Sequence, residues 1–253
     1  MSPAVILPDL KGSTALVTGS SAGIGRAIAQ GLLDQGARVF GFDRNADSAS
    51  GTGAAFMPIR CDLADAADIA RAFAEVRRQT SHLDHVVNVA GMDSKVSLEE
   101  GDAAVFDRIM NLNLRGYYLV IRESLGLLRQ GRGKSIVNIS SINYSLGVPK
   151  RSIYSASKAA TLGLTRGLAR ELGREGIRIN TVTPGWIFTE RQIEEYFTGK
   201  DREKNLEYLY RVQSTTHHIT PEDIANHVLF QLSSASRAST GSNWVVDAGW
   251  LLQ

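Results

Sequence analysis

A tyrosine and a lysine stand four residues apart, at Tyr154 and Lys158, where a stretch with helical periodicity begins. Residues at this spacing lie on one face of a helix. A positive ammonium beside a phenol favours the phenolate and lowers a pKa that is ordinarily about 10 toward the working pH. The pair therefore predicts a general base, the kind of group that removes a proton from a reacting hydroxyl.

Ser141 stands 13 residues before Tyr154 and closely follows an apolar run at 135–139. Such a run is typical of a buried strand, and its carboxyl end brings Ser141 to the edge of a sheet beside the start of the Tyr154 helix. A tyrosine and a lysine at this spacing also occur by chance in many helices. Because Ser141 is expected beside Tyr154 and Lys158, the three side chains together form a candidate site.

Three glycines, Gly19, Gly23 and Gly25, lie between the strand expected at 14–18 and the helix expected at 24–35. They permit a tight turn, a close approach of the main chain to a pyrophosphate, and close packing of helix on strand. The start of the helix adds N–H donors and the positive end of its dipole. The loop predicts a dinucleotide site, because it has a strand before it and a helix after it.

An acidic residue, Asp43, closes the second strand 18 residues beyond Gly25. A carboxylate there accepts hydrogen bonds from the adenosine ribose hydroxyls and repels a 2′-phosphate, which favours NAD over NADP. The neighbouring Arg44 leaves an alternative open, because a guanidinium can pair with that phosphate, stack on the adenine or point into solvent.

Short apolar strands alternate along the chain with longer helical stretches, a pattern that implies parallel strands with crossover helices. The expected fold is α/β: a single Rossmann-like domain spanning 1–253, with a doubly wound parallel sheet of seven strands. Six of the strands fall at 14–18, 38–42, 85–89, 135–139, 177–182 and 242–246. The helices are expected at 24–35, 67–78, 104–129, 154–172 and 221–232.

One segment departs from this alternation: between 190 and 211, 11 of 22 residues are charged, with apolar residues interspersed at helical spacing. A solvated amphipathic helix or pair of helices explains it locally. Because it follows a strand end, where open α/β sheets bind their ligands, we also expect a substrate lid at about 190–218.

Composition excludes several classes of protein. The 28 Lys and Arg nearly balance the 26 Asp and Glu, which argues against a nucleic-acid surface, and no apolar run reaches the length of a membrane span. The single cysteine, Cys61, is expected to be a small buried apolar residue of a cytoplasmic protein. The five histidines show no metal-ligand spacing, so we expect no metal site.

In their order along the chain, the glycine loop, Ser141, Tyr154 and Lys158 resemble the short-chain dehydrogenase/reductase family, and the resemblance covers nearly the whole chain. Val89 and Ala248 depart from residues common in the family, Asn and Gly, and neither departure removes a catalytic group. The other runs that carry the resemblance are Cys61-Asp62-Leu63, Asn88-Val89-Ala90-Gly91, Asn113-Leu114-Arg115-Gly116, Pro184-Gly185-Trp186-Ile187-Phe188-Thr189 and Asp247-Ala248-Gly249-Trp250.

The resemblance implies that Tyr154 is the acid/base, that Lys158 binds the nicotinamide ribose and tunes Tyr154, that Ser141 holds the reacting oxygen, and that Asn113 supports a water in a proton relay. It also implies a homotetramer whose contacts use the helices at 104–129 and 154–172. The residues expected to line the NAD cofactor are Gly19, Ser21, Gly23, Ile24, Gly25, Asp43, Asp62, Leu63, Asn88, Ala90, Gly91, Tyr154, Lys158, Pro184, Gly185, Ile187 and Thr189.

Three further features are similar to the bacterial aldose 1-dehydrogenases of the family, which implies oxidation of a sugar at its anomeric hydroxyl. They are Asp93 soon after Gly91, the run Thr189-Glu190-Arg191-Gln192, and the ending Val246-Asp247-Ala248-Gly249-Trp250. A sugar pocket needs carboxylate and amide groups for hydroxyls and an aromatic face for C–H groups. With Ser141 and Tyr154, the residues expected to serve these needs are Asp93, Asn143, Gln192 and either Trp186 or Tyr144.

Three other functions remain open from the sequence. The first is an NADPH-dependent ketone or 3-oxoacyl-thioester reductase, which Asp43 disfavours. The second is a polyol or secondary-alcohol dehydrogenase, which these residues do not separate from a sugar dehydrogenase. The third is a non-catalytic dinucleotide-binding regulator, because fold does not fix function. A binding module has no need of a tuned base, so Ser141, Tyr154, Lys158 and Asn113 together count against it.

Overall fold

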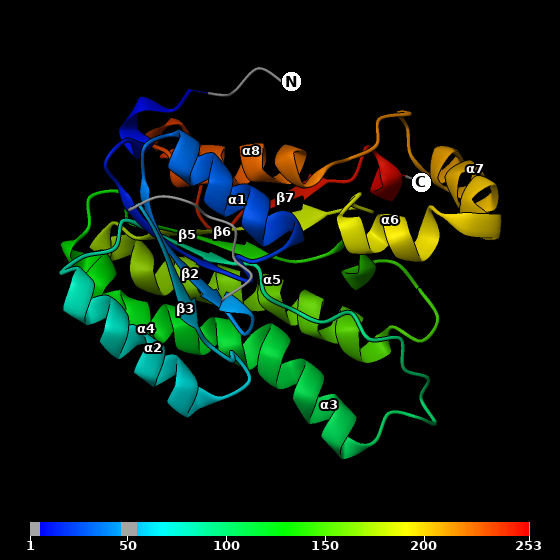
Figure 1. Cartoon of the computed structure of the whole chain (residues 1–253), viewed down its shortest axis with the longest axis horizontal. Coiled ribbons are helices and arrows are strands. Elements are labelled where there is room, and N and C mark those ends of the chain that lie inside the picture. The colour runs from blue at the N-terminus through cyan, green and yellow to red at the C-terminus, as the bar shows by residue number, and fades with distance from the viewer. Residues whose placement is uncertain (1–5, 47–54, 253) are drawn as a thin grey trace.

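The computed structural model describes residues 6–46 and 55–252. Its centre is one seven-stranded sheet in the order β3-β2-β1-β4-β5-β6-β7 (Figure 1). All neighbouring strands pair in parallel. The strands are β1 Thr14–Thr18, β2 Arg38–Asp43, β3 Phe56–Arg60, β4 His85–Asn88, β5 Ser135–Ile139, β6 Arg178–Pro184 and β7 Asn243–Val246.

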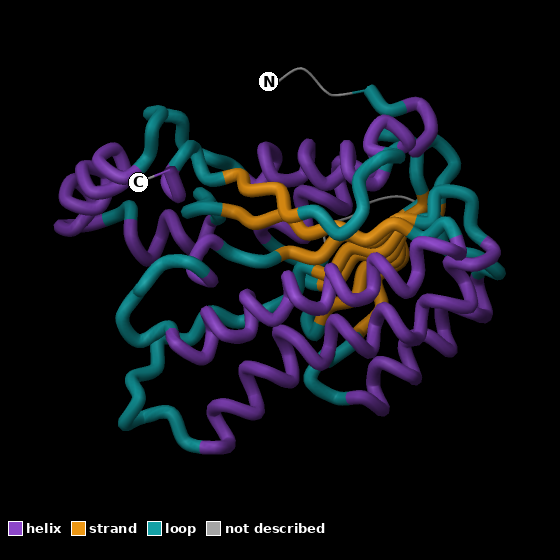
Figure 2. The backbone as a smooth tube through the Cα atoms, turned by 180° about the vertical axis from the view of Figure 1, so that it is seen from behind, coloured by secondary structure: helices purple, strands orange, loops and turns teal. Residues whose placement is uncertain are grey.

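Helices cover both faces of the sheet and form the three layers seen from behind in Figure 2. Helices α1 and α8 share one apolar core with the sheet, and α2, α4 and α5 share the other. The helices are α1 Gly23–Asp34, α2 Ala66–Gln79, α3 Ala103–Met110, α4 Gly116–Gln130, α5 Ser152–Leu172, α6 Glu190–Tyr196, α7 Arg202–Val212 and α8 Pro221–Leu232.

The inner strands are nearly continuous apolar runs because both of their faces are covered. Every residue of β1 and of β5 is buried. The chain leaves β1 toward β2 and β3 on one side of the sheet and returns to β4 on the other, so β1 and β4 are neighbours. Open parallel sheets bind ligands outside the carboxyl ends of the strands, at the point where the strand order reverses. The glycine loop and Tyr154 lie at this edge of the sheet.

The structure confirms the expected fold class and locates the strand that the pattern left unplaced. That strand, β3, contains Pro58 and lies at the edge of the sheet, where a missing N–H donor is tolerated. The helix expected at 104–129 is divided by a π-helical turn, Asn111–Arg115. A π turn closes its hydrogen bonds over one more residue than an α-helical turn, and such turns are frequent at functional sites.

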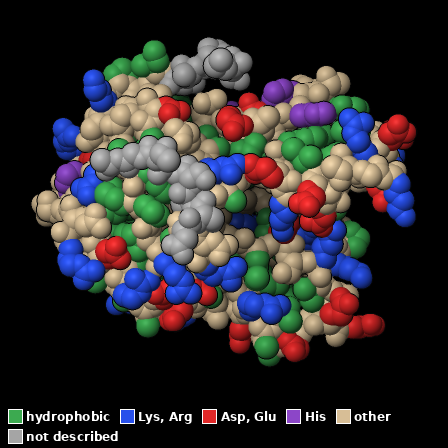
Figure 3. All heavy atoms as spheres, viewed as in Figure 1, with side chains coloured by type: hydrophobic (Ala, Val, Ile, Leu, Met, Phe, Trp, Pro, Cys, Tyr) green, Lys and Arg blue, Asp and Glu red, His purple; other side chains and the backbone are tan. Residues whose placement is uncertain are grey.

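The segment expected as a lid forms α6 and α7, which lie beyond one end of the sheet beside the C-terminus (Figure 1). On the face drawn in Figure 3, acidic and basic side chains are interspersed and form no single basic stripe. Among the described helices, none is both long and apolar enough to cross a membrane.

Candidate active site

Tyr154 and Ser141 meet at the carboxyl edge of the sheet. Tyr154 lies in the first turn of α5, and Ser141 follows β5 and caps a short 3₁₀ turn. Both side chains line a cavity of about 440 Å³, and a hydrogen bond joins the serine to the phenol. The structure thus brings together two groups that stand 13 residues apart in the sequence.

Lys158 lies one turn further along α5, with only 3% of its surface exposed. Its Nζ donates a hydrogen bond to the main-chain carbonyl of Ile139 at 2.9 Å and lies 3.4 Å from the Tyr117 hydroxyl. The same nitrogen is 5.9 Å from the centroid of the Tyr154 ring. The lysine is therefore held beside the tyrosine by groups of β5 and α4.

The proton affinities of the pair differ from the sequence-based expectation. Burial raises the pKa of Tyr154 to about 12, while hydrogen bonding from Ser141 and the nearby Arg151 and Arg191 charges act in the opposite direction. Burial also lowers the pKa of Lys158 to about 8. The expected lowering of the phenol pKa was wrong, because the cost of burying the charged phenolate exceeds the effects that stabilise it.

Asn113 lies in the π-helical turn and joins three parts of the site. Its side-chain amide donates to the main-chain carbonyl of Met92 at 2.9 Å and to the Ser157 hydroxyl at 3.0 Å. Its side-chain oxygen accepts from the Met92 N–H at 2.9 Å. These bonds fix the loop after β4 against α5. Participation of Asn113 in a proton relay stays a prediction.

The glycine loop has the close packing that its sequence predicts. Gly19 has a φ of +67°, and a Cβ there would lie 3.0 Å from the Cα of Ala90. A Cβ on Gly25 would collide with the main-chain carbonyl of Gly19. The Ser21 N–H donates to the Asp43 carboxylate at 3.1 Å, so the acidic residue lies against the loop. Because side chains are excluded here, the main chain can approach a pyrophosphate, and the residues present fit a dinucleotide.

The other residues expected at the cofactor follow the carboxyl ends of the strands or line the cavity. Thr189 caps α6, and its methyl group would lie 3.2 Å from a Cβ on Gly23. The Asn88 side chain instead lies in the core, where it donates to Asn138 at 2.9 Å, and its oxygen has no partner among the described residues. Those that line the cavity are Ile24, Gly91, Tyr154, Lys158, Pro184, Gly185, Ile187 and Thr189.

The residues expected at the substrate also line the cavity: Asp93, Asn143, Trp186 and Gln192. The Trp186 indole donates to the Gln192 side-chain oxygen at 2.6 Å. Of the two aromatic candidates, Trp186 lines the cavity and Tyr144 does not. The hydrogen bond to Gln192 fixes the orientation of the indole, and its role toward a substrate stays a prediction.

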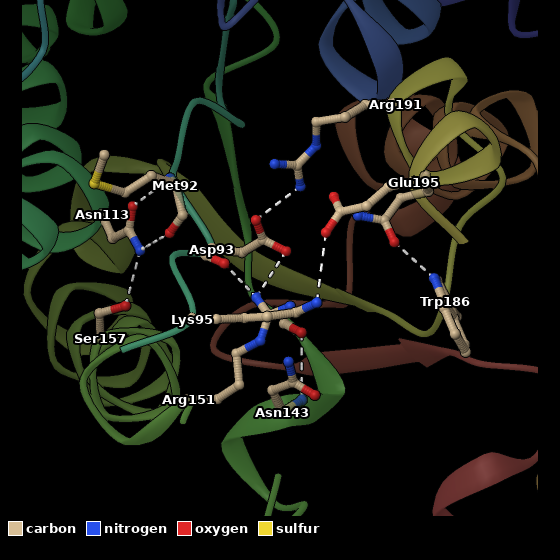
Figure 4. A network of polar contacts seen from close by, with 12 residues as sticks. Met92, Asp93, Lys95, Asn113, Asn143, Arg151, Ser157, Trp186, Arg191 and Glu195 are labelled. Atoms are coloured by element: carbon tan, nitrogen blue, oxygen red, sulfur yellow. Dashed lines mark hydrogen bonds and ion pairs between the residues drawn. The ribbon is translucent and has the colours of Figure 1, made fainter. Parts of the chain in front are cut away.

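Several residues that line the cavity were not predicted from the sequence. Arg151 immediately precedes α5, and Arg191 lies in the first turn of α6, so each adjoins a motif that the sequence does reveal. Both pair with Asp93, as Figure 4 shows. No sequence signal identifies these pairs, because their members come from distant parts of the chain. Other residues that line the cavity and were not predicted include Lys95, Tyr196, Tyr208 and Trp250.

The remaining reactive side chains lie outside the cavity. Cys61 is 1% exposed, and burial raises the pKa of its thiol to about 12. His217 pairs with Asp223, and His218 stacks on Phe188. Within the ranges that the structure describes, no three His, Cys, Asp or Glu side chains are placed to hold a metal ion.

Comparison with known proteins agrees with this arrangement. A D-xylose 1-dehydrogenase of Caulobacter vibrioides is 33% identical over 252 residues, which is 97% of this chain and 98% of that protein. A probable galactose dehydrogenase of Rhizobium meliloti is 32% identical and covers 98% of both chains.

Two solved structures are also similar. The ligand-free aldohexose dehydrogenase of Thermoplasma acidophilum has a TM-score of 0.89 and 28% identity, with coverage of 98% of this chain and 97% of that one. A 4-hydroxyisoleucine dehydrogenase complexed with NADH has a TM-score of 0.88 and 28% identity, with coverage of 95% and 99%. A family model described as enoyl-(acyl carrier protein) reductase matches residues 19–251. The chain thus belongs to the short-chain dehydrogenase/reductase family, whose members are oxidoreductases that use a nicotinamide dinucleotide.

Proposed function

We propose that the protein is an NAD-dependent sugar dehydrogenase that oxidises an aldose at its anomeric hydroxyl to the aldonolactone. One observation carries the proposal: Tyr154 and Ser141 open into a cavity that combines the aromatic Trp186 with the polar Asp93, Asn143 and Gln192. An aromatic face opposite acceptor and donor groups matches the two sides of a sugar ring. The sugar dehydrogenases among the relatives support the same substrate class.

The chain's own residues perform the proton transfer in this proposal. Ser141 holds the anomeric oxygen by a hydrogen bond, and Tyr154 takes the hydroxyl proton. NAD, when bound, supplies the acceptor for the hydrogen and electron pair removed from the carbon. Lys158 binds the nicotinamide ribose and adds a positive charge near the phenol, which favours its deprotonation.

Cofactor choice rests on Asp43. Its carboxylate accepts the Ser21 N–H at 3.1 Å and the Asn45 N–H at 2.9 Å, so it is held beside the loop expected to bind the dinucleotide. Arg44, the alternative partner for a 2′-phosphate, is exposed. Repulsion between a fixed carboxylate and a phosphate favours NAD.

The experiment that tests this function measures NADH production from a panel of pentoses, hexoses and deoxyhexoses against secondary alcohols, steroids and polyols. We expect turnover with one or more aldoses and release of the corresponding lactone. Activity confined to apolar alcohols, or NADP-dependent reduction of 3-oxoacyl thioesters with no sugar activity, would overturn it.

Helix α6 and the segment after it are proposed to close over bound substrate. Three ion pairs hold α6 in the structure, and they join Glu190 to Arg26, Arg191 to Asp93, and Glu195 to Lys95. All of them involve exposed side chains, and such pairs contribute little free energy each, so the ion pairs add little to the cost of opening the helix. Hydrogen exchange of α6 that slows when sugar and NAD are both bound supports a lid.

A homotetramer through the long helices is the proposed assembly. Tyr118 on α4 is 46% exposed and borders a second cavity of about 390 Å³, together with Met110, Leu114 and Leu164. A largely apolar surface that α4 and α5 share with the turn before α4 is suited to burial against a second copy. Light scattering tests the mass, and Tyr118→Glu is expected to reduce it.

A further inference from the structure

The substrate cavity carries more positive than negative charge. Four cationic side chains and one carboxylate from the described residues line it. Lys158 is assigned to the cofactor ribose in the proposed function, and Lys95 pairs with Glu195 at 3.5 Å. Of the lining residues, Arg151, Arg191 and Asp93 then remain, and they sum to one positive charge.

The two arginines reach the same carboxylate from opposite sides (Figure 4). Arg151 Nη1 lies 2.8 Å from Asp93 Oδ2, and Arg191 Nη2 lies 2.7 Å from Oδ1. The Arg151 side chain is only 10% exposed, whereas the Arg191 side chain, on α6, is 64% exposed. Each guanidinium therefore spends one nitrogen on Asp93 and retains further N–H donors beside the cavity.

A second guanidinium is unexpected if the ligand is neutral. A sugar hydroxyl donates one hydrogen bond and accepts others, so it needs an acceptor and a donor from the protein. Asp93 supplies the acceptor and Arg151 supplies the donor. Arg191 is exposed in this structure, but if α6 closes over a neutral ligand its guanidinium loses hydration without gaining a further countercharge. An anionic group on the ligand provides that countercharge, and Arg binds carboxylates through two parallel hydrogen bonds.

We propose that the substrate is an acidic aldose, a uronic acid whose carboxylate is bound by Arg191 and Arg151 while its anomeric hydroxyl faces Tyr154. The inference rests on the proposed function and specifies its substrate class. Arg151 Cζ lies 5.9 Å from the centroid of the Tyr154 ring, so the anion site and the base stand within the span of one sugar ring. The single surplus charge matches a carboxylate rather than a phosphate dianion.

The reaction balances without participation of the carboxylate. The C1 hydroxyl proton passes to Tyr154, and the C1 hydrogen leaves with its two electrons to NAD, which becomes NADH. A carbonyl bond forms at C1, and the product is the lactone of an aldaric acid.

The first test compares matched sugars. We measure kcat/KM with NAD for galacturonate against galactose, for glucuronate against glucose, and for the two hexose 6-phosphates. The proposal expects a uronate to exceed its neutral partner by about 10- to 100-fold, the range that charge-assisted hydrogen bonds provide. Activity with neutral aldoses alone, or a preference for the phosphates, would overturn the acidic substrate and leave the sugar dehydrogenase standing. No activity with any of these sugars would count against the proposed function itself.

The second test uses variants of the arginine on α6. Arg191→Gln is expected to lower kcat/KM for the uronate by about 10-fold or more and to change the value for the neutral sugar by less than about 3-fold. Arg191→Lys should restore part of the loss. The control is Lys200→Gln, which removes an equal charge from an exposed position between α6 and α7 that does not line the cavity.

A binding measurement separates recognition from catalysis. A ligand that binds only the folded protein raises its thermal midpoint. Without NAD, galacturonate or glucuronate should stabilise the protein and the Lys200→Gln variant, and should stabilise Arg191→Gln much less. Equal stabilisation of all three proteins would show that Arg191 does not bind the carboxylate and would overturn the proposal.

Discussion

The Lys158 ammonium nitrogen lies 5.9 Å from the centroid of the Tyr154 ring, one helical turn away, and the lysine is only 3% exposed. Its contacts are the Ile139 carbonyl and the Tyr117 hydroxyl, which are neutral acceptors. Because no carboxylate among the described residues pairs with it, its positive charge is retained at a cost in folding free energy. That cost is measurable.

Replacing Lys158 with Met should change how stability depends on pH. The pKa of the lysine falls from 10.5 to about 8 on folding, so between these values the unfolded chain binds more protons than the folded one. The free energy of unfolding of the unmodified protein therefore rises with pH across this window, by up to about 3 kcal/mol. Lys158→Met should lose this rise and be the more stable protein below pH 8, apart from differences in packing.

Urea titrations from pH 7 to 10 test this expectation. The pKa of Tyr154 is raised from 10.0 to about 12, so its own contribution has the opposite sign and begins only near pH 10. Tyr154→Phe serves as a control that should leave the slope below pH 10 unchanged. Parallel curves for the unmodified protein and Lys158→Met would contradict a charged lysine buried at this cost.

Tyr154→Phe should reduce turnover by at least ~10²-fold, the contribution typical of a general base, and leave NAD affinity nearly unchanged. Since burial raises the pKa of the phenol to about 12, the fraction of phenolate, and with it sugar oxidation, should increase with pH in the unmodified protein. The residual rate of the Phe variant should lack this increase. Steady-state kinetics from pH 6 to 10 measure the turnover and its pH dependence for both proteins. Near-normal turnover of Tyr154→Phe would show that Tyr154 is not the general base.

Asp43→Ser should weaken NAD binding and improve binding of NADP. The substitution removes the carboxylate that accepts ribose hydroxyls and repels a 2′-phosphate, and it leaves the exposed Arg44 free to pair with that phosphate. The ratio of kcat/KM for the two cofactors is the measurement. A higher kcat/KM with NADP than with NAD in the unmodified protein would contradict the proposal that Asp43 selects NAD.

Gly25→Ala should lose dinucleotide binding, because the added Cβ collides with the Gly19 carbonyl and must push the two arms of the loop apart. The matched control is Gly126→Ala on α4, where a Cβ meets no atom within 4 Å. The control should bind NAD normally and gain about 0.5–1 kcal/mol of stability from the removal of a helical glycine. Fluorescence titration with NADH distinguishes the variants, and equal affinities would contradict the close packing.

The sequence by itself determined the architecture, because the features responsible are local. Strand and helix periods alternate regularly, so parallel pairing with crossover helices follows, and the carboxyl ends of the strands then meet at one edge. The four-residue spacing of Tyr154 and Lys158 is likewise set within a single helix. For this reason local patterns could predict many of the residues that line the cavity, among them Ser141, Tyr154 and Lys158.

Only the tertiary structure decided the properties that depend on distant segments. Asp93 pairs with Arg151 and Arg191, residues 58 and 98 positions away, and no local pattern encodes such a meeting. The pKa of Tyr154 also depends on distant segments, because the packing of separate elements buries the phenol. This burial raises the pKa, whereas the sequence predicted that Lys158 would lower it. Charge balance and proton affinity at the site are sums over the whole fold, whereas helix faces and strand ends are properties of the chain itself.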